Sequence, residues 1–295
     1  MKAIIQHNFT SGLGDFVSDV SHYMTILNGA KKIGYEIHLK ISLRSNKYVR
    51  TPFFKILFDE ETINFFDSIS ETNNTHYELE IDGCNYYGSN HHPQKPGQHH
   101  FDIFFDQIPN NFQFSIFDAQ RIHLENKIPS VLPKPHESIL EKVNLFWDKN
   151  PKDYNFLHIR TSDIIDGNND RYDRIINNIR NYIKETNEYY HLGTNNNYIY
   201  KILKEEPNVF TYEFDNYDVV NNDMNAFTNG LYYGNLDDSI LEHRLKNIFA
   251  EMVSIGKSKK IIFAYDISWI SNFLFYPLSV SNNKIELINK NGWVV

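Results

Sequence analysis

The start of the chain switches between the hydrophobic spacing of strands and that of helices. The apolar run Lys2 to Gln6 has the pattern of a buried strand. Apolar residues then recur at nearly helical spacing from Phe16 to Lys32, and Gly34 ends this pattern. Glu36 to Ile41 has the pattern of the next strand. This order of strand, loop, helix and strand predicts the opening of a parallel, doubly wound sheet.

The second half of the chain restarts this alternation after a weaker stretch, in which we expect short strands at Tyr77 to Ile81 and Phe101 to Phe105. Helices are then predicted over Glu137–Asp148, Asp170–Thr186, Asn197–Lys204, Asp238–Ile255 and Ser268–Phe275. Strands are predicted over Tyr154–Ile159, Tyr189–Leu192, Val209–Phe214, Lys260–Ala264 and Lys284–Ile288.

A proline-rich segment separates the two halves. Pro129 to Pro135 holds three prolines and has the composition of a linker. A length of 295 residues fits two domains, at roughly 100–200 residues per domain. We therefore expect an α/β protein with domains at residues 1–133 and 134–295. Two such halves would form a cleft between the carboxyl ends of their strands, where open α/β sheets bind ligands.

Charge and cysteine content narrow the class of partner. The formal net charge is -8 and the pI is about 5.9, which disfavours a nucleic-acid partner because such partners need a basic face. A nucleotide diphosphate is compatible, since one or two arginines suffice to bind it. The single cysteine, Cys84, fits a reducing compartment, and no stretch reaches the roughly 18 apolar residues of a membrane helix. We expect a cytoplasmic protein that meets membranes only peripherally.

Two glycines stand between the first expected strand and helix, in the segment Gly12 to Asp15. Glycine lets the backbone approach a ligand, and a helix start offers unpaired N–H groups to an anion. The third glycine of the dinucleotide-binding fingerprint is missing. Two interpretations stay open: Gly12 and Gly14 contact a ligand, or the segment is a tight turn in which Asp15 caps the helix.

The segment His158 to Asp163 follows an expected buried strand and carries a second candidate site. Strand alternation puts His158 and Arg160 on one side. Arginine at the end of such a strand is costly unless it meets a carboxylate or an anion, and its fork matches the oxygens of a pyrophosphate. Asp163 would hold Arg160 or His158 in place. The alternative is an Arg160–Asp163 ion pair that only ends the strand.

This segment resembles the His-x-Arg-Arg-x-Asp motif of the α-1,2- and α-1,6-fucosyltransferases and their nodulation-factor relatives. His158, Arg160 and Asp163 fall on the motif, whereas Thr161 stands at its second arginine. The segment Gly12 to Asp15 resembles the Gly-Leu-Gly-Asn-Gln start of the α-1,2 group, with aspartate in place of asparagine.

Two further segments resemble the same family, in the family's order along the chain. Leu192 to Asn196 resembles its Ser-Thr-Asp-Asp segment, with Asn195 and Asn196 in place of the two aspartates. Glu251 to Trp269 resembles its Asp-x-x-Leu-Met-Ser…Ile-Ile…Ser-x-Phe-Ser-Trp-Trp block, whose Ser-Trp falls on Ser268 and Trp269.

The resemblance implies the GT-B architecture, in which two Rossmann-type domains with parallel sheets face an interdomain cleft. It also implies that the C-terminal domain holds GDP-fucose and that fucose passes with inversion to a glycan hydroxyl, without a metal ion or a resident cofactor. Arg160 would neutralise the β-phosphate of the leaving GDP, and such stabilisation is worth roughly 3–4 kcal/mol per donor. The nucleotide-sugar site would be lined by Gly12, Gly14, His158, Arg160, Asp163, Thr194, Asn195 and Ser268.

An inverting displacement benefits from a base on the acceptor hydroxyl. Relatives that use an acidic residue have it shortly after the arginine motif, where this chain has Asp166 and Asp170. We take Asp166 as the candidate base. The alternative is that both are solvated loop carboxylates.

Three activities fit the sequence. The first is transfer of fucose from GDP-fucose, the second is transfer of another sugar by a GT-B enzyme, and the third is binding of a nucleotide sugar by a catalytically degenerate relative. The segments around Arg160 and Ser268 favour fucose, whereas the glycine segment does not separate the first two activities. The departures at positions 161, 195 and 196 keep the third open.

Two further groups are expected to have structural roles. Four histidines at positions 91, 92, 99 and 100 stand in a Pro- and Gly-containing loop and lack the i, i+4 spacing of helical metal sites, so we expect no metal there. Glu251 is expected to support neighbouring groups or to cap a helix rather than to react.

Overall fold

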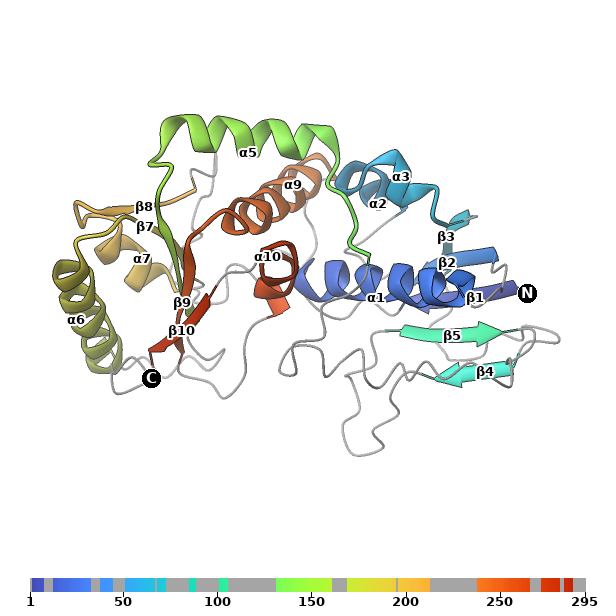
Figure 1. Ribbon diagram of the computed structural model, residues 1–295, viewed down its shortest axis with the longest axis horizontal. Coiled ribbons are helices and arrows are strands. Elements are labelled where there is room, and N and C mark those ends of the chain that lie inside the picture. The colour runs from blue at the N-terminus through green and yellow to red at the C-terminus, as the bar shows by residue number, and fades with distance from the viewer. Residues whose placement is uncertain are drawn as a thin grey trace.

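The computed structural model arranges the chain as two β-sheets with helices between and around them (Figure 1). It describes residues 2–7, 13–32, 38–44, 51–66, 68–72, 85–88, 101–105, 131–160, 169–194, 196–212, 238–265, 272–281 and 284–288. The strands of the first sheet lie within residues 2–105 and those of the second within 155–288, and the domain boundary at 133/134 stays a prediction.

The first sheet has the order β3-β2-β1-β5-β4. Its strands are β1 (Lys2–His7), β2 (His38–Arg44), β3 (Ser68–Thr72), β4 (Asn85–Gly88) and β5 (Phe101–Phe105). The prediction of a parallel sheet holds for β1, β2 and β3 and is wrong for β5, which runs antiparallel to both β1 and β4. Residues 89–100 join β4 to β5, and a link of this length is at the lower limit of about a dozen residues for a parallel crossover, whereas an antiparallel pair needs only a few.

The first helix, α1 (Leu13–Lys32), begins earlier than its apolar spacing predicted. Gly14 was expected in a loop but is a buried residue of the first helical turn. Leu13 is 3% exposed and packs in the core, and its burial favours extending the helix back to this point. The helices α2 (Thr51–Leu57) and α3 (Glu60–Ile63) were not predicted.

The second sheet is parallel throughout its described strands, in the order β10-β9-β6-β7-β8. Its strands are β6 (Asn155–Arg160), β7 (Tyr190–Thr194), β8 (Val209–Phe210), β9 (Lys260–Tyr265) and β10 (Lys284–Ile288). Around it lie α5 (Glu137–Lys149), α6 (Asn169–Thr186), α7 (Asn197–Leu203), α9 (Asp238–Ile255), the 3₁₀ turn η1 (Asn272–Leu274) and α10 (Phe275–Val280).

Helices cover both faces of this second sheet (Figure 1). Leu157 and Ile262 pack into a cluster with residues of α6 and α7, whereas Phe156 and Ile261 pack into a cluster with Ile255 at the end of α9. Successive residues of a strand point to opposite faces, so neighbours in β6 and β9 are divided between the two clusters. This is the doubly wound arrangement that the alternation of elements predicted.

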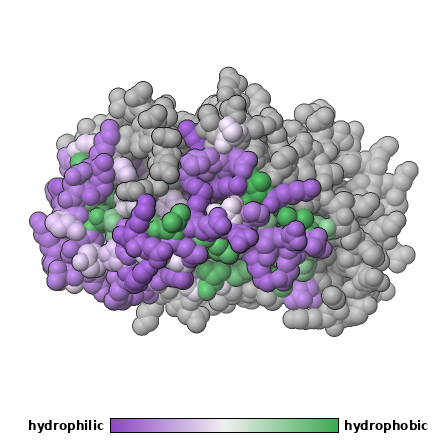
Figure 2. Space-filling model, turned by 90° about the horizontal axis from the view of Figure 1, so that it is seen from above, coloured by the Kyte–Doolittle hydropathy of each residue, from purple (hydrophilic) through white to green (hydrophobic). Residues whose placement is uncertain are grey.

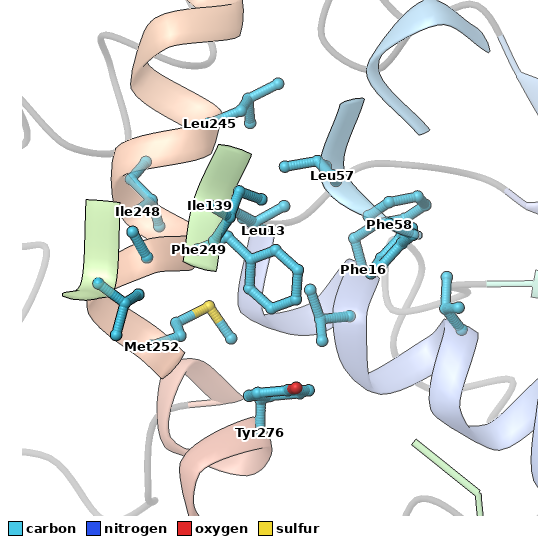
Figure 3. Close-up of a cluster of buried hydrophobic side chains, with 14 of the residues drawn as sticks. Leu13, Phe16, Leu57, Phe58, Ile139, Leu245, Ile248, Phe249, Met252 and Tyr276 are labelled. Carbon is cyan, nitrogen blue, oxygen red and sulfur yellow. The ribbon is translucent and has the colours of Figure 1, made fainter. Parts of the chain in front are cut away.

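The largest hydrophobic cluster joins helices from both halves of the chain (Figure 3). Leu13 and Phe16 enter it from α1, Phe58 from the end of α2, and Phe249 from α9. The ring centroid of Phe58 lies 5.6 Å from that of Phe249 and 6.0 Å from that of Phe16. The ring of Tyr276 of α10 meets that of Phe249 edge-to-face at 5.2 Å. The helices beside the first sheet are therefore fixed to the helices beside the second by shared burial.

The proline-rich linker is bonded to the corner between α2 and α3. The Lys134 carbonyl accepts from the Asp59 N–H at 3.0 Å, and the His136 N–H donates to the Leu57 carbonyl at 2.8 Å. His136 then caps α5, because its side chain accepts from the Ser138 N–H. The start of α5 is thus held against the first half of the chain.

The face of the molecule that carries α5 is mainly hydrophilic in its described part, with hydrophobic residues in small patches (Figure 2). Leu140 and Leu145 of α5 are 41% and 61% exposed. Within the described ranges, none of the helices has the length and apolarity that crossing a bilayer requires.

The shared cluster predicts a large effect of Phe58→Ala. Phe58 is fully buried between Phe16, Phe54 and Phe249, so truncation leaves a cavity and should lower the free energy of unfolding by about 3–5 kcal/mol. Urea denaturation measures this change. The exposed Leu140→Ala should change stability by less than about 0.5 kcal/mol. Equal unfolding midpoints for the two variants would contradict the shared core.

Candidate functional site

The second sheet contains a point at which its connections diverge. From β6 the chain passes through α6 to β7 and then to β8 on one side, and it returns through α9 to β9 and β10 on the other. In open α/β sheets, ligands bind outside the carboxyl ends of the strands at such a switch point. The carboxyl ends of β6 and β9 therefore form the candidate site.

Backbone pairing brings three strand ends together at this site. Arg160, the last residue of β6, pairs with Tyr265, the last residue of β9. On the other side of β6, Ile159 pairs with Thr194 at the end of β7. The switch point thus contains the predicted catalytic residue Arg160 and also Tyr265, which the sequence analysis did not select.

The chain leaves this pair of strand ends through residues 161–168 and 266–271, which lie outside the described residues. These two segments contain the predicted site residues Asp163, Asp166 and Ser268. Gly12 and Asn195 also lie outside the described part. Their predicted roles stay predictions, although Asp163, Asp166 and Ser268 follow directly from the two strands that meet at the switch point.

His158 lies in the interior, two residues before the end of β6. It is 7% exposed, and its ring is stacked on Phe263 at 5.3 Å and on Phe273 at 5.7 Å, with interplanar angles of 13° and 12°. The ring is therefore part of the aromatic layer between the sheet and η1. Its contact with a nucleotide stays a prediction.

The turn from β7 into α7 is shaped by its own side chains. The Thr194 Oγ1 accepts from the Asn196 N–H at 3.1 Å. Asn196 is 1% exposed and caps α7, because its Oδ1 accepts from the Ile199 N–H at 3.1 Å. Thr194 and Asn196 thus fix the backbone on either side of Asn195, the residue predicted to contact the nucleotide sugar.

Gly193 is in close contact with two other elements. A Cβ atom on Gly193 would lie 2.6 Å from the Phe156 ring and 3.3 Å from the Glu251 Oε1. The first distance is too short for real atoms, so only glycine fits here without a shift of the Phe156 ring. Glu251 of α9 therefore lies directly against the backbone of β7. The expectation that it caps a helix is wrong, since it lies inside α9, one turn before the helix ends.

The sequence matches no protein-family model and no curated protein. The structure, in contrast, resembles solved structures over its whole length. The fucosyltransferase NodZ from Bradyrhizobium aligns with 100% of this chain and 98% of its own, with a TM-score of 0.53 and 12% identity. NodZ co-crystallised with GDP aligns with the same coverage and identity at a TM-score of 0.54. A mutant of Arabidopsis thaliana FUT1 in complex with GDP aligns with 97% of this chain and 69% of its own, with a TM-score of 0.50 and 11% identity.

The chain has the fold of the fucosyltransferases NodZ and FUT1. The resemblance seen in short segments around Arg160 and Glu251 is thereby confirmed at the level of the fold. The segments around these two residues lie at the end of β6 and along α9 and β9 of the second sheet.

Within this fucosyltransferase fold, Glu251 lies beside a buried histidine. The His191 Nε2 is 3.8 Å from the Glu251 Oε1, and both side chains are almost fully buried. The His191 ring is packed among Phe146, Phe156 and Phe210, at centroid distances of 4.9, 5.1 and 5.6 Å. Sequence reasoning missed His191, although a histidine within the apolar strand pattern Tyr189 to Leu192 marks a buried polar group.

Burial favours the neutral form of both groups in this pair. It raises the pKa of Glu251 to about 8 and lowers the pKa of His191 to about 3. An ion pair would require the opposite shifts, and the apolar surroundings oppose it. At neutral pH Glu251 therefore keeps its proton and His191 is uncharged.

The described residues contain no group of three or more His, Cys, Asp or Glu side chains that would hold a metal ion. The four histidines between positions 91 and 100 lie outside that part of the chain.

The buried pair predicts how stability depends on pH. Between the ordinary pKa of Glu251, 4.5, and its folded value of about 8, the folded chain keeps a proton that the unfolded chain releases. Stability due to Glu251 therefore falls as the pH rises through this interval, by up to about 1.4 kcal/mol per unit. Glu251→Gln has no titrating carboxyl at this position. The free energy of unfolding of this variant, measured by urea denaturation, should therefore rise relative to that of the wild type as the pH increases from 5 to 8.

Glu242→Gln is the matched control for this experiment. Glu242 lies on the same helix but is partly exposed and pairs with Lys246 at 2.8 Å. The free energy of unfolding of Glu242→Gln should differ from that of the wild type by the same amount at every pH from 5 to 8. A parallel course for Glu251→Gln as well would show that Glu251 titrates as an exposed carboxyl, contrary to its buried position.

Proposed function

We propose that the chain is an inverting fucosyltransferase that moves fucose from GDP-fucose to the hydroxyl of a glycan. The observation that carries the proposal is Arg160, which ends the central strand of a parallel sheet at its switch point, in a fold like that of NodZ. NodZ has been crystallised with GDP and soaked with GDP-fucose. Arginine matches the oxygens of a diphosphate, and the switch point is where open α/β sheets bind nucleotides.

In the proposed reaction the acceptor oxygen forms a bond to the anomeric carbon of fucose as the bond from that carbon to the β-phosphate oxygen breaks. The electron pair stays on GDP, where the guanidinium of Arg160 stabilises the developing charge. The acceptor proton passes to the carboxylate of Asp166. Attack opposite the leaving group inverts the anomeric carbon. The donor would lie in the cleft between the two Rossmann-type halves.

The substitution of asparagine for aspartate at position 196 does not favour the degenerate alternative. Asn196 is used to cap α7, and asparagine and aspartate cap helices about equally well. Asparagine in place of aspartate at position 196 therefore still caps α7. The departures at Thr161 and Asn195 keep a catalytically degenerate relative that binds a nucleotide sugar as the second candidate.

Arg160→Ala tests the proposal directly. Loss of one donor to the leaving phosphate should lower kcat for fucosyl transfer by about 10²–10³-fold. Arg160→Lys should recover only part of this rate, because lysine keeps the charge and loses the planar fork. Release of GDP from GDP-fucose in the presence of glycan acceptors measures the rates.

Arg180→Ala serves as the control, because Arg180 pairs with Glu206 at 2.5 Å, away from the switch point. It should leave kcat unchanged. A thermal-shift comparison of GDP, UDP and ADP identifies the nucleotide, since only a true ligand raises the melting temperature with its concentration. The fucose assignment is wrong if GDP has no effect while UDP or ADP stabilises the chain.

A further inference from the structure

We propose that Glu251 is a positioning residue of the donor site: from α9 it fixes Gly193, and with it the turn that follows β7, in the place where the sugar diphosphate would meet the chain. This inference rests on the proposed function. It concerns a residue that acts through the backbone of another element, not a residue that touches the donor.

The first support is the contact of one carboxyl group with two positions of β7. Glu251 lies 3.8 Å from the His191 Nε2, and its Oε1 is 3.3 Å from where a Cβ of Gly193 would be. Residues 191 and 193 lie on the same face of the strand because side chains alternate. Glu251 therefore touches the last two α9-facing positions of β7.

The second support is the way in which Gly193 connects to the candidate site. It pairs with His158 in β6, and the next residue, Thr194, pairs with Ile159 beside Arg160. The Thr194 Oγ1 then accepts a hydrogen bond from the Asn196 N–H, and this bond ties the start of α7 to the end of β7. A displacement of Gly193 would pass directly to Thr194.

The third support is the cost of burying a carboxyl group at this position. The neighbouring inward residues of α9 are Ile248, Met252 and Ile255, all buried and apolar. A leucine would pack here without the cost of removing a carboxyl from water. That cost is accounted for if the close packing of the carboxyl group against Gly193 and beside His191 holds β7 in register against α9.

The charge state of Glu251 gives this role a pH dependence. Glu251 faces His191 from β7, and Tyr154, which precedes β6, lies near His191 with its hydroxyl bonded to the Ser254 carbonyl at 2.6 Å. Burial raises the pKa of Tyr154 to about 12, so this group stays neutral. Loss of the Glu251 proton above about pH 8 would leave a buried negative charge against β7 and loosen the turn.

The test compares Glu251→Gln, which keeps the shape and the neutral form, with Glu251→Leu, which keeps only the volume. Hydrogen exchange of residues 190–199 is measured without ligand. Glu251→Leu should exchange about tenfold faster, Glu251→Gln should match the wild type, and the control Glu242→Gln should not change. Unchanged exchange in Glu251→Leu would overturn the positioning role whether or not the chain binds GDP.

The second measurement is the Kd for GDP between pH 7 and 9. At pH 7, Glu251→Leu should bind about tenfold more weakly, and Glu251→Gln within about twofold of the wild type. As the pH rises from 7 to 9, the affinity of the wild type for GDP should fall and that of Glu251→Gln should not. A loss of packing alone would not produce this difference in pH dependence. Equal weakening in both variants at pH 7 would show direct contact with GDP and overturn the inference. A wild type without affinity for GDP would instead refute the proposed function.

Discussion

The burial of aromatic and aliphatic side chains between the two halves of the chain is the interaction on which the structure depends. Phe16 comes from α1 and Phe58 from the residue after α2, both beside the first sheet, whereas Phe249 and Tyr276 come from helices beside the second. Each edge-to-face pair adds about 0.5–1.5 kcal/mol to the burial of its apolar area. Because this cluster is continuous, the two sheets are held in one arrangement by packing, in addition to the covalent linker.

Helix α9 connects this cluster to the candidate site. Phe249 lies in the shared core. Two residues later, Glu251 contacts Gly193 and lies near His191 of β7, just before the turn to α7. At 3.6 residues per turn, these two side chains leave the helix in different directions, so α9 contacts both the first half of the chain and β7. The same helix therefore contacts both the shared cluster and the last residues of β7 beside the switch point.

The sequence predicted those parts of the fold that hydrophobic spacing determines. The apolar runs of β5 and β9 and the long pattern of α9 were found with nearly the observed bounds. The strands β3 and β4 were missed, because they are the edges of the first sheet and their sequences lack a long apolar run. The start of α1 was missed because Gly14 looked like a loop residue, whereas the burial of Leu13 depends on tertiary packing.

The residues of the candidate site likewise fall into those that the local sequence indicated and those that only the structure brought together. Arg160 was selected as a candidate because its charge at the end of an apolar strand is unusual within the local sequence. The contact of Glu251 with His191 and Gly193 joins residues about sixty positions apart, and no local pattern encodes it. Tyr265 reached the site only through the register of β9 against β6. Local sequence therefore selected the candidate group Arg160, and only the three-dimensional packing brought Glu251, Gly193 and Tyr265 into view.

The most direct test of this account is a crystal structure of the chain with GDP bound. The account predicts the diphosphate at the carboxyl ends of β6 and β9, with its oxygens on the guanidinium of Arg160 and beside the turn that follows Gly193. A diphosphate bound elsewhere, with Arg160 engaged only by protein carboxylates, would contradict it.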